Sequence, residues 1–569
     1  MTDNPFDFDG AKNLPDRLLI DWFIDDHNYS RFLKSSRNVL LLGHRGCGKS
    51  MTLLYYSLPL EIKKQDTPLI EKDLSHVGVY VSCSTPLARR VDHDFFEDEK
   101  FSRAISEHYF VLSIAVAIAE HCEQIVEVFD PLSLEELRDE LFYVFDDELP
   151  SDFSIFKCIK RALKKELRKT QEQFLSFENR SDFTFARTFY TLIVPFLGAL
   201  RTTSALRETH FSLMIDDAQD LNDDQRLMLN SWLSYRDHSV FSFKVALATV
   251  VDFDRKTSTG GSIIEGHDYI AINLEQPFQN ENSQFGMLAR SIIEKRLKNI
   301  GVNATPDEFF EESPEFKAEL EICWQEVVDN YIAANPGAER KQVNDYAYKQ
   351  ARALYFRKRS PKANRPIYSG LDTLIHLSSG VVRNLLLPCY WMYDDAVSKC
   401  PGEPVRKISP AIQADVIMRE SEKLWSRVRD GLDRELEDCT KEQAKLIFNL
   451  VSALGDYFRD RLFNHVSEPR IITFTISERT PEADNQLMPI LGLMRKAQVM
   501  YRRSGPSKDA GRQEDYYTLN RLFWPARGLD PHGQHGRASI KASALLGSML
   551  TGKFPSVAES DTQRGLFDE

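Results

Sequence analysis

The sequence predicts an α/β fold in which a mainly parallel sheet carries helices on both faces. The first observation is an apolar segment, Val39–Leu42, that runs directly into the glycine-rich segment 43–50. The second is the alternation of short β-branched or apolar segments with helical stretches along the chain. The third is that polar residues suited to ligand binding follow three of these segments, where parallel sheets place their ligands.

The glycine-rich segment predicts a phosphate-binding loop. Residues 43–50 read Gly-His-Arg-Gly-Cys-Gly-Lys-Ser, which fits G-x-x-x-x-G-K-[ST] between a buried strand and a helix. Lys49 is expected to reach the β- and γ-phosphates of ATP, and the Ser50 hydroxyl to ligate Mg²⁺. A chance glycine-rich turn is the alternative, which the strand before the loop and the helix-forming residues after it disfavour. The residues expected to bind the nucleotide are Gly43, Arg45, Gly46, Cys47, Gly48, Lys49, Ser50 and Met51.

Four more segments have strand character and are separated by helical stretches. They are residues 77–83, 211–215, 243–250 and 268–274. Residues 101–206, between the first two of these, show helical periodicity almost throughout, which predicts a large helical insertion. Its stretch 157–173 is strongly basic. We interpret that stretch as a solvated helix face rather than a polyanion contact, because acidic residues offset its charge.

An acidic pair, Asp216-Asp217, follows the apolar segment 211–215. We expect Asp216 to hold Mg²⁺ through a water or hydroxyl, and Asp217 to orient and polarise the attacking water. A helix N-cap and turn is the alternative, and the phosphate loop upstream favours the catalytic interpretation. Aspartate has one methylene less reach than glutamate. The pair therefore predicts slow hydrolysis of ATP, as in a switch rather than a fast motor.

Three further residues are candidate catalytic groups. Thr249, at the end of segment 243–250, could sense the γ-phosphate or the attacking water, and a threonine that merely ends a strand is an equal alternative. Arg383 follows the turn at Ser379-Gly380 and could bind the phosphates, with a structural salt bridge as the alternative. Arg236, just past the helix that follows the acidic pair, is a candidate arginine finger into a neighbouring subunit.

The length of the chain predicts more than one domain, because 569 residues are too many for one core. We place the nucleotide-binding core in residues 1–280, with its insertion at about 101–206. Residues 281–404 are helical and contain a charged insertion at about 303–364, whose basic run 357–362 we interpret as a solvated loop. A C-terminal domain is expected over residues 405–554, followed by a mobile polar tail, residues 555–569.

The C-terminal domain has the order helix, helix, β-hairpin, which is typical of a winged helix. Its helices are expected at 441–463 and 486–494, and its strands at 498–501 and 515–519. Residues 495–527 carry eight basic and three acidic side chains, a net charge of +5 within an acidic chain. Arg502, Arg503 and Lys508 could contact DNA phosphates, and a surface for protein contact is an equal alternative.

Composition excludes several classes of protein. The formal net charge of −13 argues against a general polyanion binder. Eight scattered cysteines without a C-x-x-C pair predict free thiols in a reducing cytoplasm rather than disulfides or a zinc site. His532 and His535 have no thiols or carboxylates clustered beside them, so we interpret them as loop residues. No signal peptide is visible, and the longest mostly apolar run, 109–119, is too short for a bilayer, so no membrane contact is expected.

The motifs together resemble a known family. The phosphate loop, Ile215-Asp216-Asp217-Ala218-Gln219, strand-terminal Thr249 and Gly380-x-x-Arg383 occur in this order. They resemble the origin-recognition-complex-like branch of the AAA+ ATPases, where these positions are Walker A, Walker B, sensor 1 and sensor 2. The resemblance implies a P-loop NTPase core, a helical lid carrying sensor 2 and a C-terminal winged helix. The Asp-Asp pair is more typical of the related STAND ATPases. Chains with this layout, including a long insertion before Walker B, also resemble prokaryotic ATPases of antiphage and mobile-element conflict systems, where the ATPase is a sensor or regulator for an effector.

Three functions are compatible with these residues. The first is an Mg-ATP-dependent regulatory ATPase, a switch that assembles with itself and with a protein effector in a prokaryotic conflict system. The second is a DNA-binding, initiator-like ATPase of replication or element maintenance. The third is a nucleotide-gated scaffold that does not hydrolyse ATP. No effector chemistry is evident in the sequence, so any cutting or modification is expected of a partner.

Overall fold

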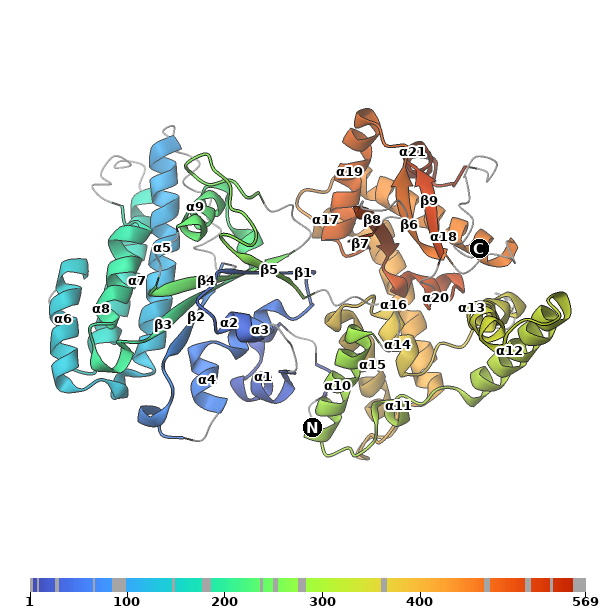
Figure 1. The fold of residues 1–569 in the computed structure, drawn as a ribbon, viewed down its shortest axis with the longest axis horizontal. Coiled ribbons are helices and arrows are strands. Elements are labelled where there is room, and N and C mark those ends of the chain that lie inside the picture. The colour runs from blue at the N-terminus through green and yellow to red at the C-terminus, as the bar shows by residue number, and fades with distance from the viewer. Residues whose placement is uncertain are drawn as a thin grey trace. The chain divides into compact units, whose positions relative to one another are not determined.

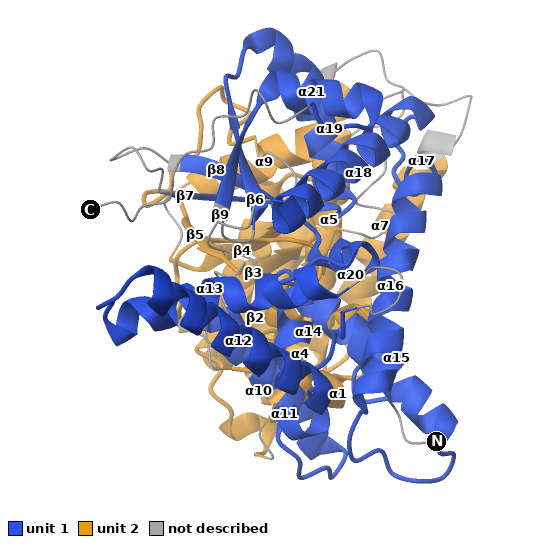
Figure 2. Ribbon diagram, turned by 90° about the vertical axis from the view of Figure 1, so that its right-hand side faces the viewer, with its two compact units in different colours: residues 1–8, 276–569 blue, residues 9–275 orange. Residues whose placement is uncertain are grey.

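The computed structural model describes residues 4–7, 10–25, 30–64, 67–83, 99–145, 149–175, 186–235, 239–248, 254–274, 283–359, 366–464, 471–506, 513–532 and 536–555. The chain divides into two compact units (Figure 2). Unit 2 comprises residues 9–275, and unit 1 comprises residues 1–8 together with residues 276–569. Each unit contains one sheet of the described chain.

Unit 2 is built on a five-stranded sheet whose neighbouring strands all run parallel (Figure 1). In spatial order the strands are β2 (His76–Ser82), β3 (His210–Asp216), β4 (Phe241–Ala248), β1 (Val39–Gly43) and β5 (Ile270–Asn273). Every residue of β4 is buried, as expected for a central strand with both faces covered. The predicted α/β class is confirmed. Because β1 and β3 both flank β4, the phosphate loop and the acidic pair emerge at one edge of the sheet.

Helices cover both faces of this sheet. Leu41 of β1 and Ala246 of β4 face a core that is closed by α2 (Ser30–Leu33) and α3 (Lys49–Tyr55). Leu40 and Val245 belong to a larger core on the opposite face. Other helices of unit 2 are α1 (Asp16–Trp22), α4 (Leu58–Lys64), α5 (Glu99–Glu123), α6 (Pro131–Phe145), α7 (Ile155–Leu175), α8 (Val194–Leu200) and α9 (Asp223–Ser234).

The helical insertion supplies much of the larger core. Phe189 lies against Trp232 of α9, with ring centroids 4.5 Å apart, and within 5.7 Å of the ring of Phe243 on β4. Residues 101–123 of α5 form the one described helix that is long and apolar enough to cross a bilayer, and 61% of its most apolar window is buried. We interpret α5 as a core helix of unit 2.

Ion pairs join the basic helix α7 to α5. Lys160 pairs with Glu123, and the Lys164 ammonium lies 2.8 Å from a carboxylate oxygen of Glu120. Part of the basic stretch 157–173 therefore neutralises its neighbouring helix. This arrangement favours the interpretation of α7 as a solvated helix face.

A buried histidine also lies between these helices. His108 of α5 is 1% exposed. Its Nδ1 accepts a hydrogen bond from the backbone N–H of Arg187 at 3.0 Å, so Nε2 carries the proton and donates to Thr170 Oγ1 at 3.1 Å. Burial, and then the charge of Arg187, lower the pKa of His108 to about 4.

We expect acid to destabilise the chain through His108. Between its unfolded pKa of 6.5 and its folded pKa of about 4, the unfolded chain binds more protons than the folded chain. The penalty is absent above pH 6.5 and grows to about 3 kcal/mol as the pH falls to 4. Urea unfolding of the wild type and His108→Gln across this range measures it, since glutamine keeps both hydrogen bonds and does not titrate.

The slope of the unfolding free energy against pH should be smaller in His108→Gln than in the wild type. It should not vanish, because His76 of β2 also has a pKa lowered to about 4 by burial. Equal slopes in the two proteins would contradict the assignment of His108 as a buried neutral imidazole.

Unit 1 is mainly helical before its sheet begins. Its helices are α10 (Gln284–Asn299), α11 (Pro306–Phe309), α12 (Pro314–Ala334), α13 (Arg340–Lys358), α14 (Leu371–Leu377), α15 (Val382–Lys399), α16 (Pro410–Asp430), α17 (Leu432–Glu435) and α18 (Lys441–Asn464). Helices α12 and α13 pack against each other, with Tyr331 stacked on Tyr346 at 4.4 Å between ring centroids. This pair of helices falls within the charged segment 303–364.

A four-stranded sheet follows α18, in the order β7-β8-β6-β9. Its elements are β6 (Ile471–Ser477), α19 (Pro481–Lys496), β7 (Met500–Pro506), β8 (Gln513–Leu519), α20 (Trp524–Arg527), β9 (Gly536–Lys541) and α21 (Ala542–Thr551). Strands β7 and β8 form the expected antiparallel hairpin. Strands β6 and β9 pair in parallel and have no counterpart in the sequence predictions. Helix, strand, helix and hairpin therefore follow one another from α18 to β8.

Candidate nucleotide-binding site

The phosphate loop connects the end of β1 at Gly43 to the start of α3 at Lys49. Gly46 and Gly48 have φ angles of 88° and 105°, which side-chain-bearing residues rarely adopt. A Cβ added to Gly43 would lie 2.5 Å from the Cys47 sulfur, so a larger residue there would displace the Cys47 side chain. The backbone of the loop thus favours glycine at positions 46 and 48, and packing favours it at position 43.

Lys49 lies inside the loop that it is expected to serve. The residue is 6% exposed, and its Nζ donates to the carbonyl oxygens of Gly43 at 2.7 Å and His44 at 3.0 Å. Arg45 points outward, with its guanidinium 3.9 Å from an Asp220 carboxylate oxygen. The ammonium of Lys49 is therefore held at the mouth of the loop by weak acceptors that phosphate oxygens can replace.

Asp216 ends β3 and is fully buried. Its Oδ2 accepts a hydrogen bond from the Tyr80 hydroxyl at 2.6 Å. Its Oδ1 is buried and accepts no hydrogen bond from any residue that the structure describes. Burial, and then the charge of Asp217, raise the pKa of Asp216, while Tyr80 and the hydroxyl of Ser50 act in the opposite direction.

The residues present fit a magnesium ion. A buried carboxylate oxygen without a partner is costly unless a cation or donor completes it. The Ser50 hydroxyl, the predicted second ligand, lies close enough to Asp216 to act on its pKa. Hard oxygen ligands of this kind, one carboxylate and one hydroxyl, are those that Mg²⁺ takes beside nucleotide phosphates.

Asp217 is held by two side chains and an unusual backbone. It has a φ angle of 56°, in the left-handed region. Its Oδ2 lies 2.6 Å from the Lys12 ammonium, and its Oδ1 accepts from Gln219 Nε2 at 3.1 Å. Burial acts to raise the pKa of Asp217, but the hydrogen bonds from Lys12 and Gln219 and the charges of Lys12 and Lys49 together lower that pKa. The Gln219 Oε1 in turn accepts from the Ala248 N–H at 3.1 Å, which joins the end of β4 to the acidic pair.

The structure therefore brings part of the predicted site together. The loop residues, Ser50, Asp216 and Asp217 lie at one edge of the sheet in unit 2. Thr249 and Arg236 lie outside the described residues, so their roles remain predictions. Arg383 is an exposed residue in the first turn of α15 in unit 1, after the positive φ angles of Ser379 and Gly380. Its role as sensor 2 also remains a prediction.

Sequence reasoning missed three contacts of the acidic pair. Tyr80 lies on β2, whose alternation gave no reason to single out this tyrosine. Gln219 belongs to the quoted motif but had no role assigned. Lys12 precedes the sheet by more than twenty residues, and no spacing rule links it to the loop. Only the path of the chain places its ammonium on the carboxylates.

The comparison with protein families agrees with this geometry. A family model described as ORC-CDC6-like matches residues 4–332 and 316–540. The chain belongs to the ORC-CDC6-like family. The resemblance to the origin-recognition-complex-like branch is thereby confirmed, and the chain is a member of a family of AAA+ ATPases. A search of curated proteins found no match.

Solved structures similar to this ORC-CDC6-like chain have low sequence identity to it. Cdc6p from Pyrobaculum aerophilum is 12% identical, with 97% of this chain and 98% of that chain covered and a TM-score of 0.30. The Aeropyrum pernix ORC1 protein in complex with DNA is 12% identical, with 91% and 97% covered and a TM-score of 0.30. The Aeropyrum pernix ORC2 protein in ADPNP-ADP complexes is 10% identical, with 97% and 97% covered and a TM-score of 0.30. Similarity at this level carries no argument about the site.

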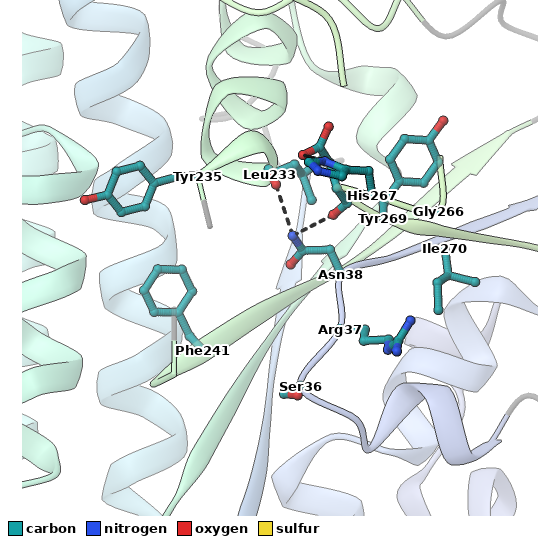
Figure 3. A pocket seen from close by; sticks show the side chains of 11 residues that line it. Ser36, Arg37, Asn38, Leu233, Tyr235, Phe241, Gly266, His267, Tyr269 and Ile270 are labelled. Carbon is teal, nitrogen blue, oxygen red and sulfur yellow. Dashed lines mark hydrogen bonds and ion pairs between the residues drawn. The ribbon is translucent and has the colours of Figure 1, made fainter. Parts of the chain in front are cut away.

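A hollow lies at the other edge of the same sheet, where β1, β4 and β5 begin (Figure 3). Its volume is about 390 Å³, and its lining includes Arg37, Asn38, Tyr235 and His267. Asn38 Nδ2 donates to the carbonyl oxygens of Leu233 and Asp268, both at 3.1 Å. The Asn38 amide thus joins the segment before β1 to the end of α9 and to the segment before β5. In this ORC-CDC6-like chain the hollow is separate from the phosphate loop, which lies at the carboxyl ends of the strands.

The basic hairpin of unit 1 has internal partners. Arg503 Nη2 donates to the carbonyl oxygen of Ser379 at 3.1 Å, and an Arg502 nitrogen lies 3.9 Å from an Asp515 carboxylate oxygen. Lys508 lies outside the described residues. Ser379 belongs to the turn that precedes Arg383. Arg503 of the ORC-CDC6-like chain is thus tied to the candidate sensor 2 turn.

Proposed function

We propose that the chain is a regulatory ATPase that binds Mg-ATP in the phosphate loop and hydrolyses it slowly. The observation that carries the proposal is the unpartnered Oδ1 of buried Asp216 beside the Ser50 hydroxyl, at the edge where Lys49 closes the loop. Ser50 and Asp216 would hold the metal. When bound, magnesium would neutralise charge on the phosphates of ATP.

The remaining steps belong to side chains of this chain. Lys49 exchanges its hydrogen bonds to the Gly43 and His44 carbonyl oxygens for hydrogen bonds to phosphate oxygens. Asp217 accepts a hydrogen bond from the attacking water and takes its proton. Gln219 holds the Asp217 carboxylate against the end of β4. Thr249 and Arg383 are proposed to sense the γ-phosphate, and Arg236 to reach into a neighbouring copy.

Asp217→Asn is the variant that tests hydrolysis. The amide cannot accept the proton of water, so we expect phosphate release to fall roughly a hundredfold or more while ATP binding is retained. Phosphate release and fluorescent-ATP binding measure the two effects. Asp223→Asn is the matched control, because Asp223 is 90% exposed at the start of α9. Equal phosphate release by Asp217→Asn and the wild type would favour the scaffold that does not hydrolyse ATP.

We propose further that nucleotide state controls assembly of the chain with itself and with a protein effector in a prokaryotic antiphage or mobile-element conflict system. The combination of the Asp216-Asp217 pair with the large helical insertion supports this role, because chains with this layout resemble ATPases of such systems. Mass measurement of the wild type and Lys49→Ala with ADP, ATP and a slowly hydrolysed analogue tests it. A mass of the assembly that is the same with ADP, ATP and the analogue would contradict the proposal.

A DNA-binding, initiator-like ATPase is the second candidate. The basic surplus of residues 495–527, on a proposed winged helix, favours it. The internal hydrogen bond of Arg503 and the nearby charge of Asp515 beside Arg502 weaken it. Duplex binding that is salt-sensitive, and that falls when Arg502, Arg503 and Lys508 are replaced by alanine, would favour the initiator role.

A further inference from the structure

A lysine near the start of unit 2 lies on the acidic pair. Lys12, in the short helix Ala11–Asn13, places its Nζ 2.6 Å from Asp217 Oδ2 and 3.6 Å from Asp216 Oδ2. The same ammonium donates to Ser82 Oγ, at the end of β2, at 2.7 Å. The Lys12 side chain is 30% exposed. A positive charge from outside the sheet thus lies against both carboxylates of the candidate site.

The contact occupies the oxygen that hydrolysis needs. Asp217 Oδ2 is bound by Lys12, and Asp217 Oδ1 is bound by Gln219. A water that is to be oriented by Asp217 must compete with an ammonium at hydrogen-bonding distance. Lys12 approaches Oδ2 of Asp216, whereas the oxygen of Asp216 that accepts no hydrogen bond from the described residues is Oδ1. Lys12 therefore restrains the proposed base more directly than it obstructs the proposed metal position.

We propose that Lys12 is a positioning residue that holds Asp217 away from the attacking water and thereby slows the hydrolysis of ATP. This inference rests on the proposed ATPase function.

The variant Lys12→Met tests the restraint. We expect its kcat for ATP hydrolysis to rise about tenfold with KM unchanged, because one charge-assisted hydrogen bond is worth roughly that factor. Lys12→Arg keeps a cation at this position and should stay at the wild-type rate. Lys12→Met should have no effect in an Asp217→Asn background. A wild-type or lower kcat for Lys12→Met, or the same increase in the Asp217→Asn background, would overturn the proposal.

A nucleotide-free measurement tests the contact itself. Reductive methylation followed by mass spectrometry should label Lys12 more slowly than Lys63, whose side chain is 53% exposed, in the wild type. Asp217→Ala should accelerate the labelling of Lys12 and leave that of Lys63 unchanged. Unchanged labelling of Lys12 would overturn the contact. If neither the wild type nor Lys12→Met binds Mg-ATP, the proposed function fails instead, which is a separate outcome.

Discussion

Replacing Lys49 with alanine is expected to lower the affinity for Mg-ATP by at least roughly a hundredfold. The Lys49 ammonium lies within the loop. Its hydrogen bonds to oxygen atoms of the described residues go to two backbone carbonyl groups, at 2.7 and 3.0 Å. A phosphate oxygen is a stronger acceptor than a carbonyl oxygen, since it is charged. The loss of two such bonds removes most of the binding free energy that is specific to the triphosphate. Isothermal titration with Mg-ATP measures the change.

Lys63→Ala is the matched control for this experiment. Lys63 lies on α4 of the same unit, is 53% exposed and pairs with Asp16 at the surface, where ion pairs contribute little to stability. Its removal should leave both the fold and the affinity unchanged. Circular dichroism of Lys49→Ala separates lost binding from lost folding. Wild-type affinity in a folded Lys49→Ala protein would show that the loop between β1 and α3 is not the phosphate site.

The parts of the fold that leave a local signal were predictable from the sequence. Strands β1, β3 and β4 are covered on both faces, so each leaves a short apolar run. Strands β6 and β9 were missed because their stability comes from pairing residues as distant as Ile471 and Gly536. No turn joins these two strands directly, so no local sequence pattern predicts that they pair. The hairpin β7–β8 was found because its strands are close in sequence.

The candidate site divides in the same way. Lys49 and Ser50 follow from a continuous motif, and Asp216 follows from the strand that precedes it. Lys12 reaches the acidic pair only because the folded chain places the short helix Ala11–Asn13 against α3. A lysine in a polar N-terminal segment looks like any solvated lysine until the path of the chain is known. Arg503 shows the converse, since a basic hairpin resembles a DNA-binding wing until its hydrogen bond to Ser379 is seen.

Residues of segment 101–206 belong to the larger core of unit 2. The sequence predicts this segment as an insertion between two strands. In the structure, Phe189 from this segment is fully buried and lies 4.5 Å from the Trp232 ring, 5.4 Å from Phe241 and 5.7 Å from Phe243, between ring centroids. Its backbone N–H donates to Glu107 of α5 at 3.1 Å. One residue therefore links the insertion, the helix after the acidic pair and the strand that leads to Thr249.

Replacing Phe189 with alanine is expected to lower the free energy of unfolding by about 3–5 kcal/mol, because the ring leaves a cavity among side chains that cannot close around it. The neighbouring Tyr190 is the matched control: it lies on the same helical turn, is 45% exposed, and its replacement by alanine should cost far less. Urea unfolding followed by tryptophan fluorescence compares the two variants. If the insertion were a separate domain attached to the ATPase core, Phe189→Ala would unfold the insertion and leave ATP binding intact. We expect the folded insertion and ATP binding to be lost together at the same urea concentration, because Trp232 and β4 share the core that Phe189 fills.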